Sequence, residues 1–213
     1  MTEPNRRVPK MRQVTLQRRE EILKAALITF GSKGYKKGSL AEIADQADMT
    51  HAGVLHHFGS KDQLLLEVLS YRDRSDVAEL EGQHIPDGLD LFRHLISTAI
   101  ANVDRPGIVQ AYAVLSAESV TDGHPARAYF EGRYRTLRGE VSDALKIVCA
   151  AHGVTDPDRV GEAVASVLAV MDGLQVQWLL EPNAVDLAKS TEFAIRAILS
   201  AVLDPRPSVL DEG

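Results

Sequence analysis

Apolar residues recur at helical spacing along almost the whole chain. Between Thr15 and Lys33 they lie three and four residues apart, which places them on one face of a helix. Gly34 is expected to end that helix as a left-handed C-cap. Similar apolar periods occupy five later segments, residues 87–103, 106–118, 125–152, 157–181 and 184–203. Strand-like alternation between turn signals appears nowhere, so the pattern predicts an all-α protein with about nine helices.

The segment from residue 38 to residue 61, GSLAEIADQADMTHAGVLHHFGSK, contains two helical pieces that are unusually short. Ser39 and Glu42 have the spacing of a capping box, in which the serine oxygen accepts the glutamate amide and the carboxylate reaches back. Asp48 follows the first piece, and aspartate tolerates a left-handed turn better than most residues. Thr50 then caps the second piece. Two short helices joined by a tight turn predict a helix-turn-helix.

A helix-turn-helix inserts its second helix into the DNA major groove, about 12 Å wide, while a small apolar core holds the helices together. The residues expected in that core are Ile22, Phe30, Ile43, Ala44, Ala47, Val54 and Phe58. The residues expected to face DNA are Ser39, Thr50, His51, Ala52, Gly53, His56, His57 and Lys61. Gly53 costs a helix about 1 kcal/mol relative to alanine. The glycine is explained either by a close approach of the backbone to DNA or by the simple tolerance of the helix for this cost.

Formal charge divides the chain at the end of this segment. Residues 1–61 hold 11 Lys/Arg and 6 Asp/Glu, a charge of +5, whereas residues 62–213 hold 13 and 24, a charge of −11. A basic segment on an acidic body indicates that the N-terminal part meets a polyanion. Four of its basic residues precede the first predicted helix: Arg6, Arg7, Lys10 and Arg12. They form either a solvated tail or an arm that follows the DNA backbone or minor groove.

The stretch GYKKGSLAEIADQADMTHAGVLHHFGSKDQLLLEVL resembles the TetR family of bacterial transcriptional regulators. The landmarks that carry the resemblance are Gly34-Tyr35, Ile43-Ala44, the turn ending at Thr50, His57-Phe58 and Ser60-Lys61. The detailed similarity covers about residues 15–70. Beyond it the resemblance lies in an all-helical second domain, where YFEGRYRTLRGEV and MDGLQVQWLLEP are similar to segments in one broad branch of the family.

The resemblance also assigns roles to single residues. His57 and Lys61 match family positions that hold the DNA backbone. Asp48 stands where the family usually has glycine, and Leu55 stands where it usually has a tyrosine that binds a DNA phosphate. Leucine cannot make that hydrogen bond, so the resemblance does not supply this phosphate contact here.

Aromatic and polar side chains gather at helical spacing in the second part of the chain. An apolar cavity with a few polar groups is how small-ligand sites are built, and the sequence therefore predicts a ligand pocket among them. A core or rim position is the alternative for each residue taken singly. The candidate pocket residues are Phe92, Tyr112, Tyr129, Phe130, Arg133, Tyr134, Met171, Asp172, Gln175 and Trp178.

The last two predicted helices, residues 157–181 and 184–203, are expected to expose mixed apolar faces. The residues on these faces are Val164, Val167, Leu168, Leu174, Leu179, Ala188, Phe193 and Ile195. The resemblance implies that the two helices pair with the same two of a second copy in a four-helix interface. A two-fold homodimer would place two reading heads on one palindromic site. Gln175 and Trp178 share one helical face, which lines either the ligand cavity or this seam.

Several other kinds of site and protein find little support in the sequence. No run of 18 apolar residues indicates a membrane span, and the N-terminus lacks the apolar core of a secretory signal. The single cysteine, Cys149, fits a reducing cytoplasm and is expected to pack as a small hydrophobe. His51, His56 and His57 lack the i, i+4 spacing and the additional ligands of a metal site. No cofactor is implied.

The sequence thus predicts a two-domain transcriptional regulator of the repressor type and not an enzyme. Residues 1–61 would form a three-helix DNA-binding domain, and residues 62–213 a helical domain that dimerises and binds a small hydrophobic or amphipathic effector. Ligand binding would shift the spacing of the two heads and so release DNA. A small helical enzyme and a protein-binding adaptor are the rivals. The catalytic cluster of such an enzyme would be Glu118, Asp122 and His124, but no recognisable nucleophile accompanies them. The division of charge along the chain argues against an adaptor.

Overall fold

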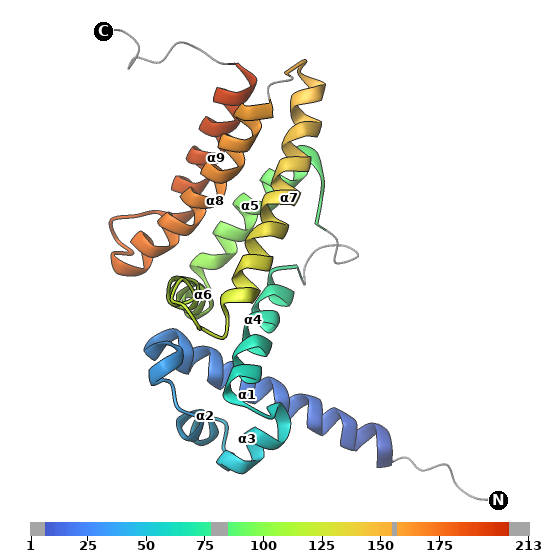
Figure 1. Ribbon diagram of the computed structural model, residues 1–213, viewed down its shortest axis with the longest axis vertical. Coiled ribbons are helices and arrows are strands. Elements are labelled where there is room, and N and C mark those ends of the chain that lie inside the picture. Colours follow the sequence, from blue (N-terminus) through green and yellow to red (C-terminus); the bar gives the residue numbers. More distant parts are fainter. Residues whose placement is uncertain (1–6, 78–84, 155–156, 205–213) are drawn as a thin grey trace, which may run out of the picture. The chain divides into compact units, whose positions relative to one another are not determined.

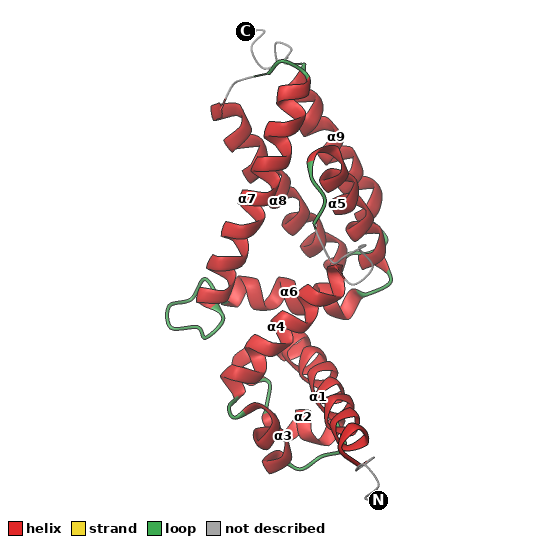
Figure 2. Cartoon of the chain, turned by 90° about the vertical axis from the view of Figure 1, so that its right-hand side faces the viewer, coloured by secondary structure: helices red, strands yellow, loops and turns green. Residues whose placement is uncertain are grey.

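The computed structural model describes residues 7–77, 85–154 and 157–204, and within them it contains nine α-helices and no strand (Figures 1 and 2). The helices are α1 (Arg7–Lys37), α2 (Leu40–Gln46), α3 (His51–Phe58), α4 (Lys61–Val77), α5 (Gly88–Val103), α6 (Pro106–Glu118), α7 (Arg127–Ala151), α8 (Pro157–Leu180) and α9 (Leu187–Leu203). The all-helical prediction is confirmed. The later helices end close to their predicted bounds because proline, aspartate and glycine punctuate the sequence there.

The first helix departs from its predicted bounds at both ends. It begins at Arg7, so Lys10 and Arg12 belong to a helix and not to an irregular tail. Their side chains, and the whole of Arg6, lie outside the described residues. Gly34 has the predicted positive φ of 72° but an extended ψ of 173°, and one more helical turn follows it as far as Lys37. Gly34 is therefore a kink and not a simple C-cap.

The chain forms two compact units. The first consists of Met1–Ser75 and Gln110–Arg127, and the second of Asp76–Val109 and Ala128–Gly213. The first unit therefore contains α1, α2, α3 and most of α4, together with most of α6 and the loop that follows it. The predicted boundary between residues 61 and 62 divides the chain by function, at the end of the DNA-binding part. The division into compact units does not test it, so this boundary stays a prediction.

The predicted core of the helix-turn-helix is confirmed. Its seven residues, Ile22, Phe30, Ile43, Ala44, Ala47, Val54 and Phe58, are all buried, and α4 adds Leu64, Leu65, Val68 and Leu69. Within the same unit α1 and α6 approach closely at Gly31. A Cβ added there would lie only 3.1 Å from the Cα of Ala111. In this unit α1 therefore shares a core with α2, α3 and α4 and also approaches α6.

The second unit has its own core between α5, α7, α8 and α9. Leu91, Leu145 and Val148 are among its buried residues. Cys149 belongs to this core, and burial raises the pKa of its thiol, so the prediction that it packs as a hydrophobe is confirmed. A smaller cluster joins Trp178 to Val109 and Leu187.

The apolar residues of α8 and α9 differ from the prediction in which of them are buried and which are exposed. Four of the eight residues assigned to an exposed face, Val164, Val167, Leu168 and Ile195, are buried in the core of the second unit, so that assignment is wrong for them. Leu174 and Leu179 are partly buried against Trp178, whereas the side chain of Phe193 is 75% exposed. Periodicity marks a wide apolar surface on each helix, but it does not show which side meets the rest of the chain.

One segment of α8 passes a length-and-composition test for a membrane span. It runs from Arg159 to Leu180 with a mean hydropathy of 1.5, and 33% of its most apolar window is buried. The core helix of a water-soluble protein passes the same test. The apolar content of this segment explains the result, because one side of the helix contributes to the core and the other carries small and apolar residues.

Gly34 offers a direct test of the α1 kink. We expect Gly34→Ala to lower the free energy of unfolding by at least about 1–2 kcal/mol, the cost of a left-handed backbone for a residue with a Cβ. The new Cβ would also lie 2.0 Å from Oε1 of Glu118. Urea unfolding followed by circular dichroism measures the change. Gly139→Ala in α7, where a Cβ meets nothing within 4 Å, is the control and should not destabilise; equal stability of both variants would contradict the account.

Candidate DNA-binding surface

Local capping sets the ends of the two short helices. The Ser39 hydroxyl accepts a hydrogen bond from the amide of Glu42 at 3.1 Å, as predicted, but the Glu42 carboxylate forms an ion pair with Lys33. Asp48 has a φ of 50°, which confirms the predicted left-handed turn. The Thr50 hydroxyl accepts from the amide of Gly53 at 3.1 Å. The two capping hydrogen bonds each span three residues, which is why the sequence reveals them.

The helix α3 has one buried and one outward side. Val54 and Phe58 are buried, and Leu55 is half-buried. The residues predicted to face DNA all lie outside the core: Ser39, Thr50, His51, Ala52 and His56 are exposed, and Gly53, His57 and Lys61 are half-buried. The Ser39 and Thr50 oxygens accept backbone amides, and their hydroxyl hydrogens remain available for phosphate oxygens. The structure therefore leaves all the predicted residues outside the core, and their contact with DNA stays a prediction.

Packing within the protein favours glycine at position 53. This reason differs from both explanations offered by the sequence, a close approach to DNA and simple tolerance. A Cβ at this position would lie 3.1 Å from Cε of Met49 and 3.2 Å from Oγ1 of Thr50. Contacts this short would crowd the hydroxyl that caps α3. Part of the helix cost of glycine is therefore explained by the cap itself.

Arg19 holds the C-terminal end of α3, and sequence reasoning did not find it. Its guanidinium lies over the ring of Phe58 at 4.3 Å from the centroid. The same group donates to the backbone carbonyl of His57 and forms an ion pair with Glu67 of α4. One side chain of α1 thus connects the recognition helix to α4. The fork of guanidinium donors makes this possible, because a lysine offers only a point charge.

His57 is suited to donate a hydrogen bond as a neutral ring. Burial lowers its pKa, and the neighbouring His56 and Arg19 lower it further. The neutral imidazole of His57 is therefore favoured, and one of its ring nitrogens still carries a hydrogen for a phosphate oxygen. This agrees with the role that the resemblance assigns to His57.

Lys61 begins α4 beside an aromatic side chain. Its ammonium lies 4.5 Å from the ring centroid of Tyr35 and donates to the carbonyl of Lys36 at 3.4 Å. Burial lowers the pKa of Lys61. The Tyr35 hydroxyl in turn donates to Asp62, and burial followed by this hydrogen bond raises the pKa of Tyr35. Tyr35 therefore positions the lysine predicted to contact phosphate, at the start of a helix whose free amides also favour anions.

The ten candidate ligand-pocket residues divide between the two compact units. Tyr112 lies in the first unit, buried beneath the guanidinium of Arg72 at 4.2 Å from its ring centroid. The other nine lie in the second unit: Phe92, Phe130, Gln175 and Trp178 are buried, and Tyr129, Arg133, Tyr134, Met171 and Asp172 are partly buried. Tyr134 donates to Asp172 at 2.6 Å. Tyr112 therefore belongs to a different compact unit from the other nine, and a ligand pocket among these residues stays a prediction.

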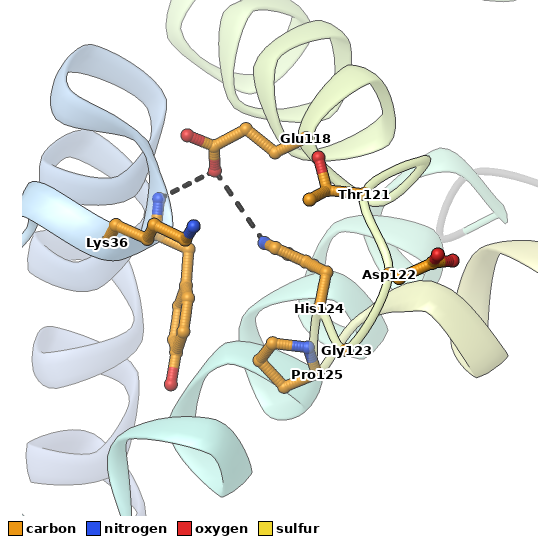
Figure 3. A pocket seen from close by; sticks show the side chains of 8 residues that line it. Lys36, Glu118, Thr121, Asp122, Gly123, His124 and Pro125 are labelled. Atoms are coloured by element: carbon orange, nitrogen blue, oxygen red, sulfur yellow. Dashed lines mark hydrogen bonds and ion pairs between the residues drawn. The ribbon is translucent and has the colours of Figure 1, made fainter.

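A cavity of about 370 Å³ lies within the first unit, where α1 and α6 end (Figure 3). Tyr35, Lys36, Glu118 and residues 121–125 line it. Two members of the rejected catalytic cluster meet there, with Oε2 of Glu118 3.7 Å from Nε2 of His124. The third, Asp122, is fully exposed and pairs with Arg127. Within the described part of the chain, no three His, Cys, Asp or Glu side chains are grouped for a metal ion.

Comparisons with known proteins cover both parts of the chain. The family model "Bacterial regulatory proteins, tetR family" matches residues 22–68, and "BetI-type transcriptional repressor, C-terminal" matches residues 90–204. The chain is 28% identical over 208 residues to the HTH-type transcriptional regulator BetI of Rhizobium meliloti, covering 90% of this chain and 96% of that protein. These matches extend the similarity well beyond the helix-turn-helix.

Solved structures show the same fold. SmeT of Stenotrophomonas maltophilia, in its complex with triclosan, superimposes with a TM-score of 0.71 at 20% identity, over 90% of this chain and 99% of that one. A transcriptional regulator from Saccharomonospora viridis in complex with choline gives a TM-score of 0.62 at 21% identity, over 87% and 97%. The proteins with which this chain shares sequence along most of its length are regulators and not enzymes.

The role of Lys61 can be tested with DNA of different sequences. We expect Lys61→Ala to weaken binding to specific and random duplexes by a similar factor, and to lower the slope of log K against log salt by about one unit, because one phosphate contact is lost. Fluorescence anisotropy at several salt concentrations measures both. Lys24→Ala, which removes an exposed lysine paired with Glu20, is the matched control. An unchanged slope for Lys61→Ala would remove this residue from the DNA contacts.

Proposed function

The chain belongs to the TetR family of bacterial regulatory proteins, and on that basis we propose that it is a ligand-responsive repressor that binds a palindromic operator as a homodimer in the cytoplasm. DNA binding by a transcriptional regulator is what its relatives share. The finer proposal concerns how this chain reads DNA, how two copies pair and what releases them.

The observation that carries the proposal is the outward face of α3. Its core side is buried, its ends are capped, and Arg19 holds its last turn. What remains outward is small or able to donate hydrogen bonds, with His51 at the first helical position. Residues near the start of a recognition helix reach base edges, whereas His57 and Lys61 flank them at backbone positions.

Pairing of two copies is supported by the uncovered side of α8 and α9. On α8 the exposed residues Gly161, Ala165 and Ala169 recur every four residues, and Val176 and Leu180 follow toward the helix end. Small side chains allow two helices to approach closely. A helix with apolar residues on both sides needs a second partner beyond its own core, and a second copy of this chain offers the same surface in two-fold symmetry.

An effector site in the second unit is supported by polar groups within its apolar interior. Gln175 and Thr191 are buried, and Oγ1 of Thr191 has no hydrogen-bond partner among the described residues. A few polar atoms in an apolar surrounding are typical of small-ligand sites. The neighbouring structures with triclosan and choline suggest small hydrophobic or amphipathic compounds as probes.

Phe193 tests the dimer. We expect Phe193→Glu to raise the dimer dissociation constant at least about ten-fold, because a Phe loses about 1.5–3 kcal/mol of burial and a charge enters an apolar seam twice. Operator affinity should fall with it. Sedimentation velocity and operator titration measure the two effects. Ile100→Glu places the same charge at an exposed apolar site of α5 and should change neither. A dimer unaffected by Phe193→Glu would contradict this interface.

The sole tryptophan tests the effector site. We expect triclosan or choline to change Trp178 emission saturably and to lower operator affinity, since the ring is buried beside Val109 and Leu187. Gln175→Leu should weaken the probe but leave operator binding without probe intact. Gln177→Leu, the same substitution at an exposed neighbour, is the control. If Gln175→Leu dissociates the dimer instead, this face belongs to the seam and the effector proposal for it fails.

A further inference from the structure

None of the ten candidate effector-site residues lines the cavity at the ends of α1 and α6, and all its lining residues belong to the first unit. Its volume of about 370 Å³ lies in the lower part of the range for small-molecule sites. Figure 3 shows a carboxylate oxygen of Glu118 and a ring nitrogen of His124 facing each other, joined by a dashed line. The cavity therefore has the size and the polar groups of a binding site.

His124 supplies a buried donor. Its side chain is only 3% exposed. Nδ1 accepts a hydrogen bond from the amide of Ala126 at 3.2 Å, so the neutral ring carries its hydrogen on Nε2. That Nε2 is buried and has no hydrogen-bond partner among the described residues. The nearest acceptor, Oε2 of Glu118 at 3.7 Å, is too distant for a direct hydrogen bond.

Glu118 supplies a fixed acceptor. Its Oε2 accepts from the amide of Tyr35 at 2.8 Å, and its Oε1 occupies the space that a Cβ on Gly34 would need. The carboxylate is thus held against the kink of α1. A carboxylate has about four acceptor positions, so Oε2 can accept a further hydrogen bond beside His124. Together the two side chains present one donor and one acceptor to the same small space.

We propose that this cavity binds a small uncharged molecule through a hydroxyl group. The hydroxyl oxygen accepts from Nε2 of His124, and its hydrogen is donated to Glu118. An ammonium group has no lone pair for the histidine donor, and a carboxylate has no hydrogen for Glu118 and is repelled by its charge. The ring of Tyr35, 5.4 Å from that of His124, and Pro125 provide apolar wall for the rest of the molecule.

The position of the cavity gives an occupant access to the DNA-binding elements. Tyr35 lines the cavity, and the ammonium of Lys61 lies over the Tyr35 ring. Its hydroxyl donates to Asp62 in the first turn of α4. A molecule bound between Glu118 and His124 therefore contacts the residue that positions the predicted phosphate contact.

Three aromatic probes that differ only in their polar group test the hydroxyl requirement. Phenol, anisole and benzoate are titrated into the full-length chain without DNA, and binding is followed by ligand-observed NMR. Phenol should saturate; anisole, which accepts but cannot donate, should bind about ten-fold more weakly, the factor for one hydrogen bond to a charged group; benzoate should not bind. Absence of saturable phenol binding means that water alone occupies the site and overturns the proposal.

Two substitutions then locate the site. Glu118→Gln keeps the side-chain shape but can turn an amide donor toward the cavity, so anisole should bind about as well as phenol, because both oxygens accept, and benzoate should gain binding. His124→Asn retains an acceptor for the Ala126 amide, removes Nε2 and should weaken phenol about ten-fold. Asp122→Asn, on the exposed loop of the same cavity, is the control and should bind as the parent does.

Circular dichroism of each variant confirms that the helices are retained. A gain of benzoate binding in Glu118→Gln cannot result from loss of structure, because an unfolded chain prefers none of the probes. Phenol binding unchanged in both Glu118→Gln and His124→Asn would place the probe elsewhere and overturn the proposal. None of these measurements uses DNA, so their failure leaves the proposed repressor function untouched.

Discussion

The shortness of α3 is the constraint on which the DNA-binding surface depends. The helix has eight residues, and isolated helices below about 12–15 residues are marginal in water. Its stability must therefore come from packing. Val54 and Phe58 insert into the core formed with α1 and α4, and Arg19 covers Phe58 and binds the carbonyl of His57. A recognition helix built in this way has a rigid inner side and leaves its outer side to the choice of DNA contacts.

The same dependence reaches a segment that is distant in sequence. The amide of Tyr35 binds Glu118, 83 residues away, and the Tyr35 ring lies under Lys61. The first compact unit therefore includes the end of α6 and its following loop as well as the N-terminal helices. Contacts made by this loop can influence the start of α4 within one unit, which gives the cavity beside His124 its mechanistic interest.

The second unit shows how one apolar helix serves two surfaces. On α8, Val164 and Leu168 are core residues, whereas Ala165 and Ala169, one position further along, are exposed. The exposed side is apolar enough for the helix to pass a membrane test by composition. The pairing with a second copy that we propose would account for this composition without a membrane, because the small residues recur at the spacing of a helix contact.

The sequence by itself determined the features that act within a few residues of one another. The caps at Ser39 and Thr50 and the turn at Asp48 follow from side-chain chemistry and backbone preference, and the helical period then identified the core of the first unit. Only the tertiary structure decided that Arg19 and Tyr35 hold the DNA-binding elements, that Tyr112 belongs to a different compact unit from the other candidate pocket residues, and which side of α8 is buried. These features depend on contacts between distant segments, and a period shows that a helix has an apolar face without showing what covers it.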